Sequence, residues 1–480
     1  CLRGARRTCN QKTISGYSVL SRASTCDMKF LAVVAILSSM VLTMTTVHAQ
    51  HCTFITQRVQ CKELSCNQTT GHCIPCVVDS DCYEGAYGCF SGSCKLKPLS
   101  ETFTSRTLLA PLVGFSVCAI AVLAGVGGGA ILVPLFIAIL QIPMSDAVGL
   151  SQATICGQSI LNVILQVRRH HPDHSPPKAT RPVINYEYCN LLLPIALCGT
   201  LLGSMGNKVS PDWLRVVLLI TLFTYVLFRL IQRILHQRAR DREAKLVAER
   251  QREDSDDVEK ILEINKTVNS PLLSPEKVEE KPQHPIRWQL WTAFVFGVFF
   301  AISYVKQNVV ECGSYWYIVV VAGSFVVGCS LTGFVRLHLG SLLRKIVAGE
   351  AEACVVPFKW NVLTTIVFPL ICVVAGFAAS MLGIGGGLVF SSLLLEAGLT
   401  PEAASATGGL ATLLVAVQSA ADFVLVNELR YDYGLMMFGS GVLSTLFGQF
   451  VLMREIRRRG LTYLIVLALA LIMGGSMLAV

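Results

Sequence analysis

The amino-acid sequence predicts an all-α integral membrane protein with a small disulfide-rich module before the membrane domain. Of the 480 residues, 53% are hydrophobic and 15% are charged, whereas soluble domains carry about a quarter charged residues. Long uncharged stretches recur from about residue 108 to the last residue, and about 20 apolar residues suffice to cross a bilayer as a helix. Eight cysteines crowd between Gln50 and Pro98. This composition argues against a soluble enzyme and makes the lipid bilayer the first expected partner.

The net charge of +9 arises from 40 lysines and arginines against 31 aspartates and glutamates. The basic residues lie in short runs beside the apolar stretches, as the positive-inside rule predicts for cytoplasmic loops. We therefore expect no nucleic-acid partner.

The first methionine, Met28, begins a pattern typical of a secretory signal peptide. A lysine follows it, then an apolar run over residues 30–41 and a small-x-small cleavage pattern that ends at Ala49. We expect residues 28–49 to be a signal peptide and residues 1–27 to be translated upstream sequence. The alternative is a signal anchor that stays in the membrane, because the run is nearly long enough to cross it.

Residues 50–98 are predicted to form a disulfide-rich module. Such a short segment cannot bury enough apolar surface to fold without crosslinks, and an even number of cysteines after a signal peptide is typical of a disulfide scaffold. The cysteines expected to pair are Cys52, Cys61, Cys66, Cys73, Cys76, Cys82, Cys89 and Cys94. Eight cysteines allow 105 connectivities, so the pattern leaves the pairing open.

Two motifs indicate the environment of this module. Cys73 and Cys76 form a CxxC pair, which in the secretory pathway favours a structural bridge over a zinc or redox site, so we expect no metal. Asn67 begins an Asn-Gln-Thr glycosylation sequon, which is typical of a lumenal or extracellular face. We expect Asn67 to be glycosylated and the module to lie on that face.

Ten apolar stretches are predicted to form the membrane domain. They cover about residues 108–140, 147–167, 188–206, 213–234, 288–305, 315–335, 361–395, 403–426, 433–453 and 461–480. We assign residues 106–234 to a first transmembrane repeat, 288–335 to a connecting transmembrane pair and 361–480 to a second repeat. Residues 235–287 are rich in charges of both signs and in proline, which predicts a cytoplasmic linker.

A duplicated glycine run relates the two repeats. Residues 125–129 (GVGGG) correspond to residues 383–387 (GIGGG) at an offset of 258 residues, and Pro143 and Thr154 correspond to Pro401 and Thr412 at the same offset. At an offset of 245, the Tyr-Glu-Tyr at residues 186–188 meets the Tyr-Asp-Tyr at residues 431–433. Several landmarks in the same order indicate an internal duplication.

Each glycine-centred stretch is predicted to be a re-entrant hairpin of two partial helices. The stretches have 33 and 35 residues, which is too long for one crossing of a hydrocarbon core of about 30 Å and too short for two full crossings. With the cysteine module outside, two hairpins place the basic clusters at residues 168–181, 229–242, 336–345 and 454–459 in the cytoplasm. The hairpins then enter from opposite faces, so the halves form inverted repeats.

The glycine runs are candidate anion-binding tips. Backbone N–H groups at a helix start lack partners within the helix, and the helix dipole adds partial positive charge there. We expect a small anionic solute to bind between the two tips, at Gly127, Gly128, Gly129, Gly385, Gly386 and Gly387. The alternative is plain helix packing, because small residues are common where membrane helices cross.

Polar residues on the next predicted span of each half could complete this site. They are Ser151, Gln152, Thr154 and Gln158 in the first half, and Thr407, Thr412 and Gln418 in the second. Each could instead form an ordinary hydrogen bond between helices. Asp422 lies four residues from the end of the span at 403–426, where it could carry a coupling proton or simply reach the interface.

The two glycine segments resemble the signature halves of the sulfite exporter TauE/SafE family. The resemblance is carried by GVGGGAILVPLF with Pro143 and AVGLSQAT, and by GIGGGLVFSSLL with Pro401 and SATGGLAT. It extends from about Leu108 to Val480 and implies export or exchange of sulfite or related organosulfur anions. The cysteine module and the long linker are additions to the compact family core and resemble a eukaryotic member. In place of the family's Thr-Ser pair, this chain has Leu150-Ser151 and Gly408-Gly409.

The leading hypothesis is a multi-pass secondary transporter for a small anion in the plasma membrane or another membrane of the secretory pathway. No GxxxxGK[ST] run is present, so a gradient would drive it. The alternative is a membrane receptor, or a surface protein that binds a partner through its cysteine-rich module. No HExxH or GxSxG motif indicates an enzyme, and no cofactor is expected. Self-association into a homo-oligomer is left open.

Overall fold

The computed structural model describes much of the membrane domain and part of the cysteine-rich module. The described residues are 65–66, 72–82, 87–100, 105–123, 128–140, 142–169, 182–210, 214–221, 224, 286–310, 315–347, 360–426, 429–452 and 454–455. Several predictions concern residues outside these ranges: the signal peptide, Cys52, Cys61, the Asn67 sequon, Gly127, most of the linker and the last apolar stretch. The chain divides into two compact units, residues 1–61 with 66–74, and residues 62–65 with 75–480.

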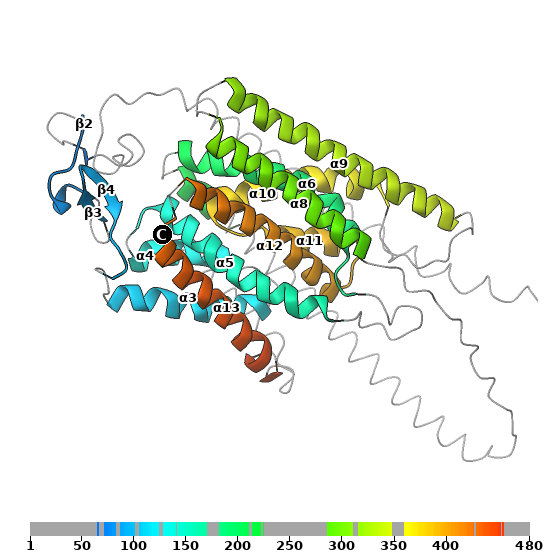
Figure 1. Ribbon diagram of the computed structural model, residues 1–480. Coiled ribbons are helices and arrows are strands. Elements are labelled where there is room, and N and C mark those ends of the chain that lie inside the picture. The colour runs from blue at the N-terminus through cyan, green and yellow to red at the C-terminus, as the bar shows by residue number, and fades with distance from the viewer. Residues whose placement is uncertain are drawn as a thin grey trace, which may run out of the picture. The chain divides into compact units, whose positions relative to one another are not determined.

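Helices dominate the second unit (Figure 1). They are α3 (Ser105–Leu123), α4 (Gly129–Leu140), α5 (Met144–Val167), α6 (Tyr186–Val209), α8 (Ile286–Asn308), α9 (Tyr315–Val347), the π-helix η3 (Leu363–Val367), α10 (Phe368–Leu382), α11 (Gly387–Glu396), α12 (Pro401–Leu425), α13 (Tyr431–Phe447) and the π-helix η4 (Gly448–Leu452). Seven helical stretches among the described residues are long and apolar enough to cross a membrane. The predicted class, a multi-pass helical membrane protein, is confirmed.

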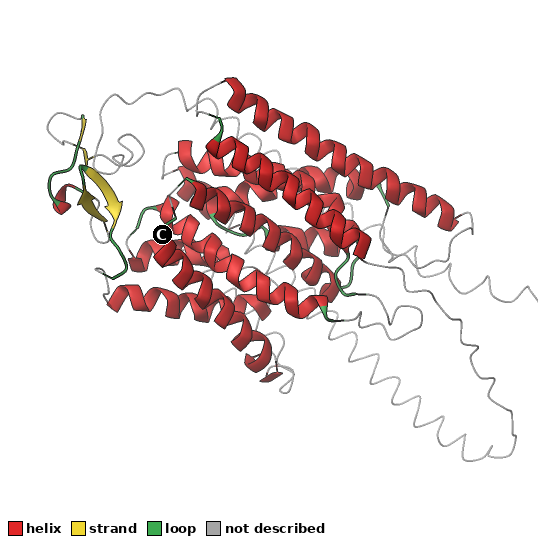
Figure 2. Cartoon of the chain, in the orientation of Figure 1, coloured by secondary structure: helices red, strands yellow, loops and turns green. Residues whose placement is uncertain are grey.

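The strands among the described residues lie in the cysteine-rich module (Figure 2). They are β1 (Ser65–Cys66), β2 (Cys73–Ile74), β3 (Tyr87–Phe90) and β4 (Ser93–Leu96), with the short 3-10 helix η1 (Asp79–Asp81) before β3. β3 and β4 form an antiparallel hairpin in which Cys89 lies opposite Cys94. Its two-residue turn is Ser91-Gly92, and both residues have positive φ, as tight hairpins require.

Two disulfides hold this hairpin to the preceding loop. Cys76 is bonded to Cys89 and Cys82 to Cys94, so each strand of the hairpin is crosslinked. Cys73 is also in a disulfide. Because Cys76 pairs with Cys89 and not with Cys73, the CxxC motif is not a redox pair. The prediction of a structural bridge at this motif is confirmed.

The glycine runs interrupt both long apolar stretches. α3 ends at Leu123 and α4 begins at Gly129, while α10 ends at Leu382 and α11 begins at Gly387. The predicted break at the glycines is therefore present. The first arms are longer than the predicted partial helices: η3 and α10 together make a 20-residue candidate span, whereas α11 has 10 residues. That each hairpin leaves the membrane on the same side from which it enters remains a prediction.

Helices from the two predicted halves interlock through glycines. A Cβ added at Gly376 of α10 would collide with the carbonyl of Ala196 on α6, and one at Gly203 of α6 would collide with Phe377 O on α10. In the same way, Gly448 after α13 lies against Ala119 O of α3. Glycine lets these backbones approach closely, which is typical of helix packing in membranes. The fourth helix of each half therefore packs on the first helix of the other half.

α8 and α9 present apolar side chains to the outside of the helical domain. Exposed residues on these helices include Phe294, Tyr304, Val326 and Phe334, as expected for side chains that face lipid. α9 continues to Val347, 12 residues past the predicted end at 335. The added turns contain charged residues but also good helix formers, so the helix persists beyond its apolar part.

Candidate substrate site

Both glycine tips use backbone conformations that favour glycine. The φ angles are +51° at Gly128, +72° at Gly383 and Gly385, and +69° at Gly386. These values lie in the left-handed region, which a residue with a Cβ adopts only at a cost. Glycine at these positions therefore allows the chain to stop one helix and begin the next within a few residues.

The two tips lie against each other. A Cβ added at Gly129 would be 2.6 Å from Gly383 O and 2.9 Å from the carbonyl carbon of Ile384. Cβ atoms essentially never approach other atoms this closely, so an alanine at residue 129 would force the backbones apart. The start of α4 and the end of α10 are thus in direct backbone contact, although they lie in different halves of the chain.

The predicted residues Ser151 and Gln152 of α5 bind the second tip. The Ser151 hydroxyl donates to Gly383 O at 2.8 Å and lies 3.4 Å from Gly129 O. Gln152 donates through Nε2 to Ala379 O at 2.6 Å. All these groups are buried. Both side chains therefore hold α5 to the tip of the other half.

The three predicted threonines use their hydroxyls within the protein. Thr154 donates to Leu150 O at 2.8 Å, and Thr412 donates to Gly408 O at 2.7 Å, each within its own helix. Thr407 accepts a hydrogen bond from the backbone N–H of Asn185 at 3.0 Å. The methyl carbon of Thr412 lies 3.5 Å from the position of a Cβ at Gly385. Thr412 thus adjoins the second tip through its methyl group.

Buried glutamine side chains supply polar atoms without partners. Within the described residues, neither Nε2 nor Oε1 of Gln418 has a hydrogen-bond partner, and the side chain is 0% exposed. Oε1 of Gln152 and Oε1 of Gln158 are also buried without partners. Oε1 of Gln158 lies 3.5 Å from the position of a Cβ at Gly128, beside the first tip. Buried polar groups are normally bonded, so each of these needs an explanation.

The helix starts at the tips carry backbone donors. α11 follows Gly386, which has no side chain to cap the helix, and no side-chain cap bond is present there. α4 begins at Gly129, directly after Gly128. The first N–H groups of any helix lack partners within that helix, and the positive end of the helix dipole lies at the same place. This arrangement is suited to an anion.

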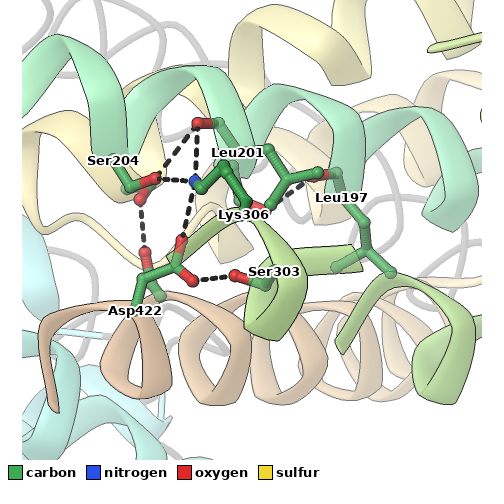
Figure 3. Close-up of polar contacts among 9 residues, drawn as sticks. Leu197, Leu201, Ser204, Ser303, Lys306 and Asp422 are labelled. Carbon is green, nitrogen blue, oxygen red and sulfur yellow. Dashed lines mark hydrogen bonds and ion pairs between the residues drawn. The ribbon is translucent and has the colours of Figure 1, made fainter. Parts of the chain in front are cut away.

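A second polar cluster lies between α6, α8 and α12 (Figure 3). Lys306 Nζ is 3.7 Å from Asp422 Oδ2, and the two side chains are 1% and 2% exposed. Lys306 also donates to Ser204 Oγ at 2.9 Å and to Leu201 O at 3.4 Å. The hydroxyl of Ser303 donates to Asp422 Oδ1. Asp422 is therefore buried in an ion pair rather than extended to the interface.

Sequence reasoning selected Asp422 but missed Lys306. The predicted span at 288–305 ended one residue before the lysine, because a lysine at the end of an apolar run is usually an interface residue. The structure continues α8 to Asn308 and buries the lysine side chain. The sequence does contain a signal for this ion pair: one lysine and one aspartate each lie near the end of an otherwise uncharged span.

The comparisons with known proteins agree with the duplicated glycine pattern. Residues 109–302 match the family model "Sulfite exporter TauE/SafE". This part of the chain is therefore similar to the TauE/SafE family. TauE/SafE proteins are membrane transporters, so the resemblance to this family and the multi-pass membrane class are both confirmed.

Relatives in Arabidopsis thaliana extend this likeness beyond the matched domain. The chain is 28% identical to "Sulfite exporter TauE/SafE family protein 3" over 374 residues, which cover 77% of this chain and 76% of the relative. It is 24% identical to family protein 5 over 393 residues, which cover 78% of this chain and 82% of the relative. No solved structure matches the chain.

Proposed function

We propose that this protein is a secondary transporter that moves a small sulfur-containing oxoanion, with sulfite as the first candidate. The anion binds between the two glycine tips. The observation that carries this proposal is the direct backbone contact between Gly129, at the start of α4, and Gly383, which lies four residues before the start of α11. Related proteins carry "sulfite exporter" in their names, which supports the choice of sulfite.

The proposed donors are backbone N–H groups and side-chain amides rather than fixed cations. The N–H groups at the starts of α4 and α11 point to the anion, and the Gln418 amide supplies a further buried donor that has no partner among the described residues. Neutral donors in a dry site bind an oxoanion without holding it as tightly as a buried arginine would. Such binding suits a transporter, which must also release its solute.

The proposed transport cycle uses the two halves as inverted repeats. The interlocked pairs α6–α10 and α3–α13 move as units around the tips, so that the site opens to one face and then to the other. The cysteine-rich module lies on the lumenal or extracellular face, since its disulfides form in an oxidising compartment. The basic loops lie on the cytoplasmic face.

The test is uptake of radiolabelled sulfite into proteoliposomes by the full chain and by two glycine variants. Gly129→Ala pushes the tips apart and is expected to reduce saturable uptake at least tenfold. Gly297→Ala on α8 is the matched control, since a Cβ there meets nothing within 4 Å, and it is expected to retain wild-type uptake. Size-exclusion profiles in detergent establish that each variant is folded.

Competition by sulfate and organosulfonates for sulfite uptake shows which class of anion the site prefers. Inhibition by sulfonates and not by chloride supports a site for sulfur oxoanions. Absence of saturable sulfite uptake by the folded wild-type protein would refute the proposed substrate. Equal uptake by Gly129→Ala and Gly297→Ala would refute the tips as the site.

A further inference from the structure

The buried ion pair between Lys306 and Asp422 contributes less to the stability of helix packing than apolar side chains would. Transfer of two charges from water to a low-dielectric interior costs more than their attraction usually returns, and apolar residues of similar volume would hold α8 to α12 at a lower cost. Ionisable residues inside a membrane domain most often serve transport or proton transfer. The side chains are 1% and 2% exposed, so the pair needs a role beyond packing.

The two oxygens of Asp422 differ in their surroundings. Oδ1 accepts the hydroxyl hydrogen bond of Ser303. Oδ2 has no hydrogen-bond partner within the described residues, and at 3.7 Å it is too far from Lys306 Nζ for a hydrogen bond. Oδ2 is therefore the atom that can take up a proton without the loss of an existing hydrogen bond.

The pair adjoins the helix that carries the second glycine tip. Ser419, one turn before Asp422 on α12, donates to the hydroxyl of Ser380 on α10 at 2.6 Å. Ser380 lies three residues before Gly383. Gly203, next to the lysine-binding Ser204, packs on Ser380 from α6, where an added Cβ would be 2.9 Å from the Ser380 Cβ. Contacts through Ser419 and Gly203 thus connect the surroundings of the ion pair to the end of α10 that forms the tip.

We propose that Lys306 and Asp422 form the proton-coupling site of the transporter, an inference that rests on the proposed function. A proton from water forms an O–H bond with Asp422 Oδ2 and leaves a neutral carboxylic acid. The positive charge of Lys306 is then no longer neutralised by Asp422, and it offsets through space the negative charge of the anion bound at the tips. When the anion leaves, the proton returns to water and the ion pair forms again. One proton accompanies one monoanion, so each such step is electrically neutral.

Apart from Lys306, the groups that contact Asp422 among the described residues are neutral. Among the contacts of the described residues, α8 contributes Lys306 and Ser303. The neighbouring α6 and α10 contribute the hydroxyls of Ser204 and Ser380 to the surrounding network. Lys306 is therefore the charged partner whose interaction changes when Asp422 binds a proton.

The test measures the pH dependence of sulfite uptake by the full-length protein in proteoliposomes. Wild-type uptake is expected to rise as external pH falls, by no more than about tenfold per pH unit for one linked proton. Asp422→Asn mimics the protonated acid and is expected to lose this dependence and to move no protons, as reported by a pH-sensitive dye inside the vesicles. Wild type and Asp422→Asn are compared at each pH value separately, so the change in protonation of sulfite itself affects both proteins equally.

Two further variants distinguish coupling from a structural role. Glu402→Gln removes an exposed carboxylate from the same helix and is the matched control, expected to keep the wild-type pH profile. The neutral double variant Lys306→Gln/Asp422→Asn avoids an unpaired buried charge and is expected to fold, but to transport sulfite at least tenfold more slowly than Asp422→Asn. Infrared difference spectra provide a readout without substrate: acidification should produce a carboxylic-acid C=O band that Asp422→Asn lacks.

The outcomes separate this proposal from the proposed function. Sulfite uptake with parallel pH profiles for wild type and Asp422→Asn, or the same infrared band in both, overturns the coupling site and leaves the transporter intact. A folded wild-type protein that moves no sulfite overturns the proposed function, and the coupling of a proton to that anion with it. Loss of the pH dependence in Asp422→Asn alone, with proton movement abolished, supports the site.

Discussion

Gln418 on α12 has a side-chain amide that is completely buried and has no hydrogen-bond partner among the described residues. A buried polar group without a partner costs roughly 1–3 kcal/mol of stability. Gln152 on α5 contrasts with it, because its Nε2 donates to Ala379 O at 2.6 Å. A structural glutamine and a ligand-binding glutamine are thus expected to respond differently to substitution by leucine.

Gln418→Leu is expected to raise the melting temperature of the detergent-solubilised protein and to weaken sulfite uptake, since it removes an unsatisfied amide and a proposed anion donor together. Gln152→Leu is expected to lower the melting temperature, because it removes a formed hydrogen bond. Thermal unfolding and proteoliposome uptake measure the two effects. A lower melting temperature for Gln418→Leu would show that its amide already serves the fold.

At the scale of the element, the cysteine-rich module is held by carboxylates as well as disulfides. Asp79 forms an ion pair with Lys97 at 2.6 Å and accepts the backbone N–H of Cys89 at 2.9 Å. Asp81 accepts the backbone N–H groups of Val77 and Val78 at 3.0 and 3.1 Å. The Lys97 contact holds the pKa of Asp79 below its ordinary value, and the bond from Val77 does the same for the pKa of Asp81.

These lowered pKa values predict acid sensitivity of the module. The stabilisation is fully present above the unfolded-state pKa of about 3.9 and is lost as the pH falls through the lower folded-state pKa. Hydrogen exchange of peptides from residues 75–96, corrected for intrinsic rates, should therefore accelerate below about pH 4. The double variant Asp79→Asn/Asp81→Asn should exchange faster at neutral pH and change less on acidification. An unchanged pH slope in that variant would contradict this assignment.

At the scale of the whole molecule, close contacts between the halves determine how the tips meet. α6 packs on α10 through Gly199, Gly203 and Gly376, where backbone atoms of the partner helix occupy the space of a side chain. Ser151 of α5 then donates to Gly383 O, 232 residues further along the chain. The tips therefore meet where helices of the two halves pack together.

Gly376→Val is expected to disrupt this packing and to lower both the melting temperature and the yield of monodisperse protein. The Cβ would collide with the carbonyl of Ala196, and the helices would have to separate. Gly333→Val on α9 is the control with the same change in volume and β-branching, since a Cβ there meets nothing within 4 Å. Equal stability of the two variants would show that α6 and α10 tolerate separation.

Several features were determined by the sequence alone because they depend on local properties of the chain. Hydropathy over about 20 residues predicted the membrane helices, and the glycines predicted the breaks at Gly128 and at residues 383–386. The crowded cysteines predicted a crosslinked module, and the sequence also placed Asp422 inside a span. Each of these inferences depends on residues that are close together in the sequence, so it requires no knowledge of the fold.

Only the tertiary structure decided which distant groups meet. It selected Cys76–Cys89 and Cys82–Cys94 among the many possible pairings, placed Gly129 on Gly383 and paired Asp422 with Lys306. The rotation of each helix about its axis determines these contacts, and in lipid an apolar sequence has little amphipathic pattern to reveal that rotation. Lys306 therefore resembled an interface residue in the sequence, whereas the packing of α6, α8 and α12 makes it the buried partner of a carboxylate.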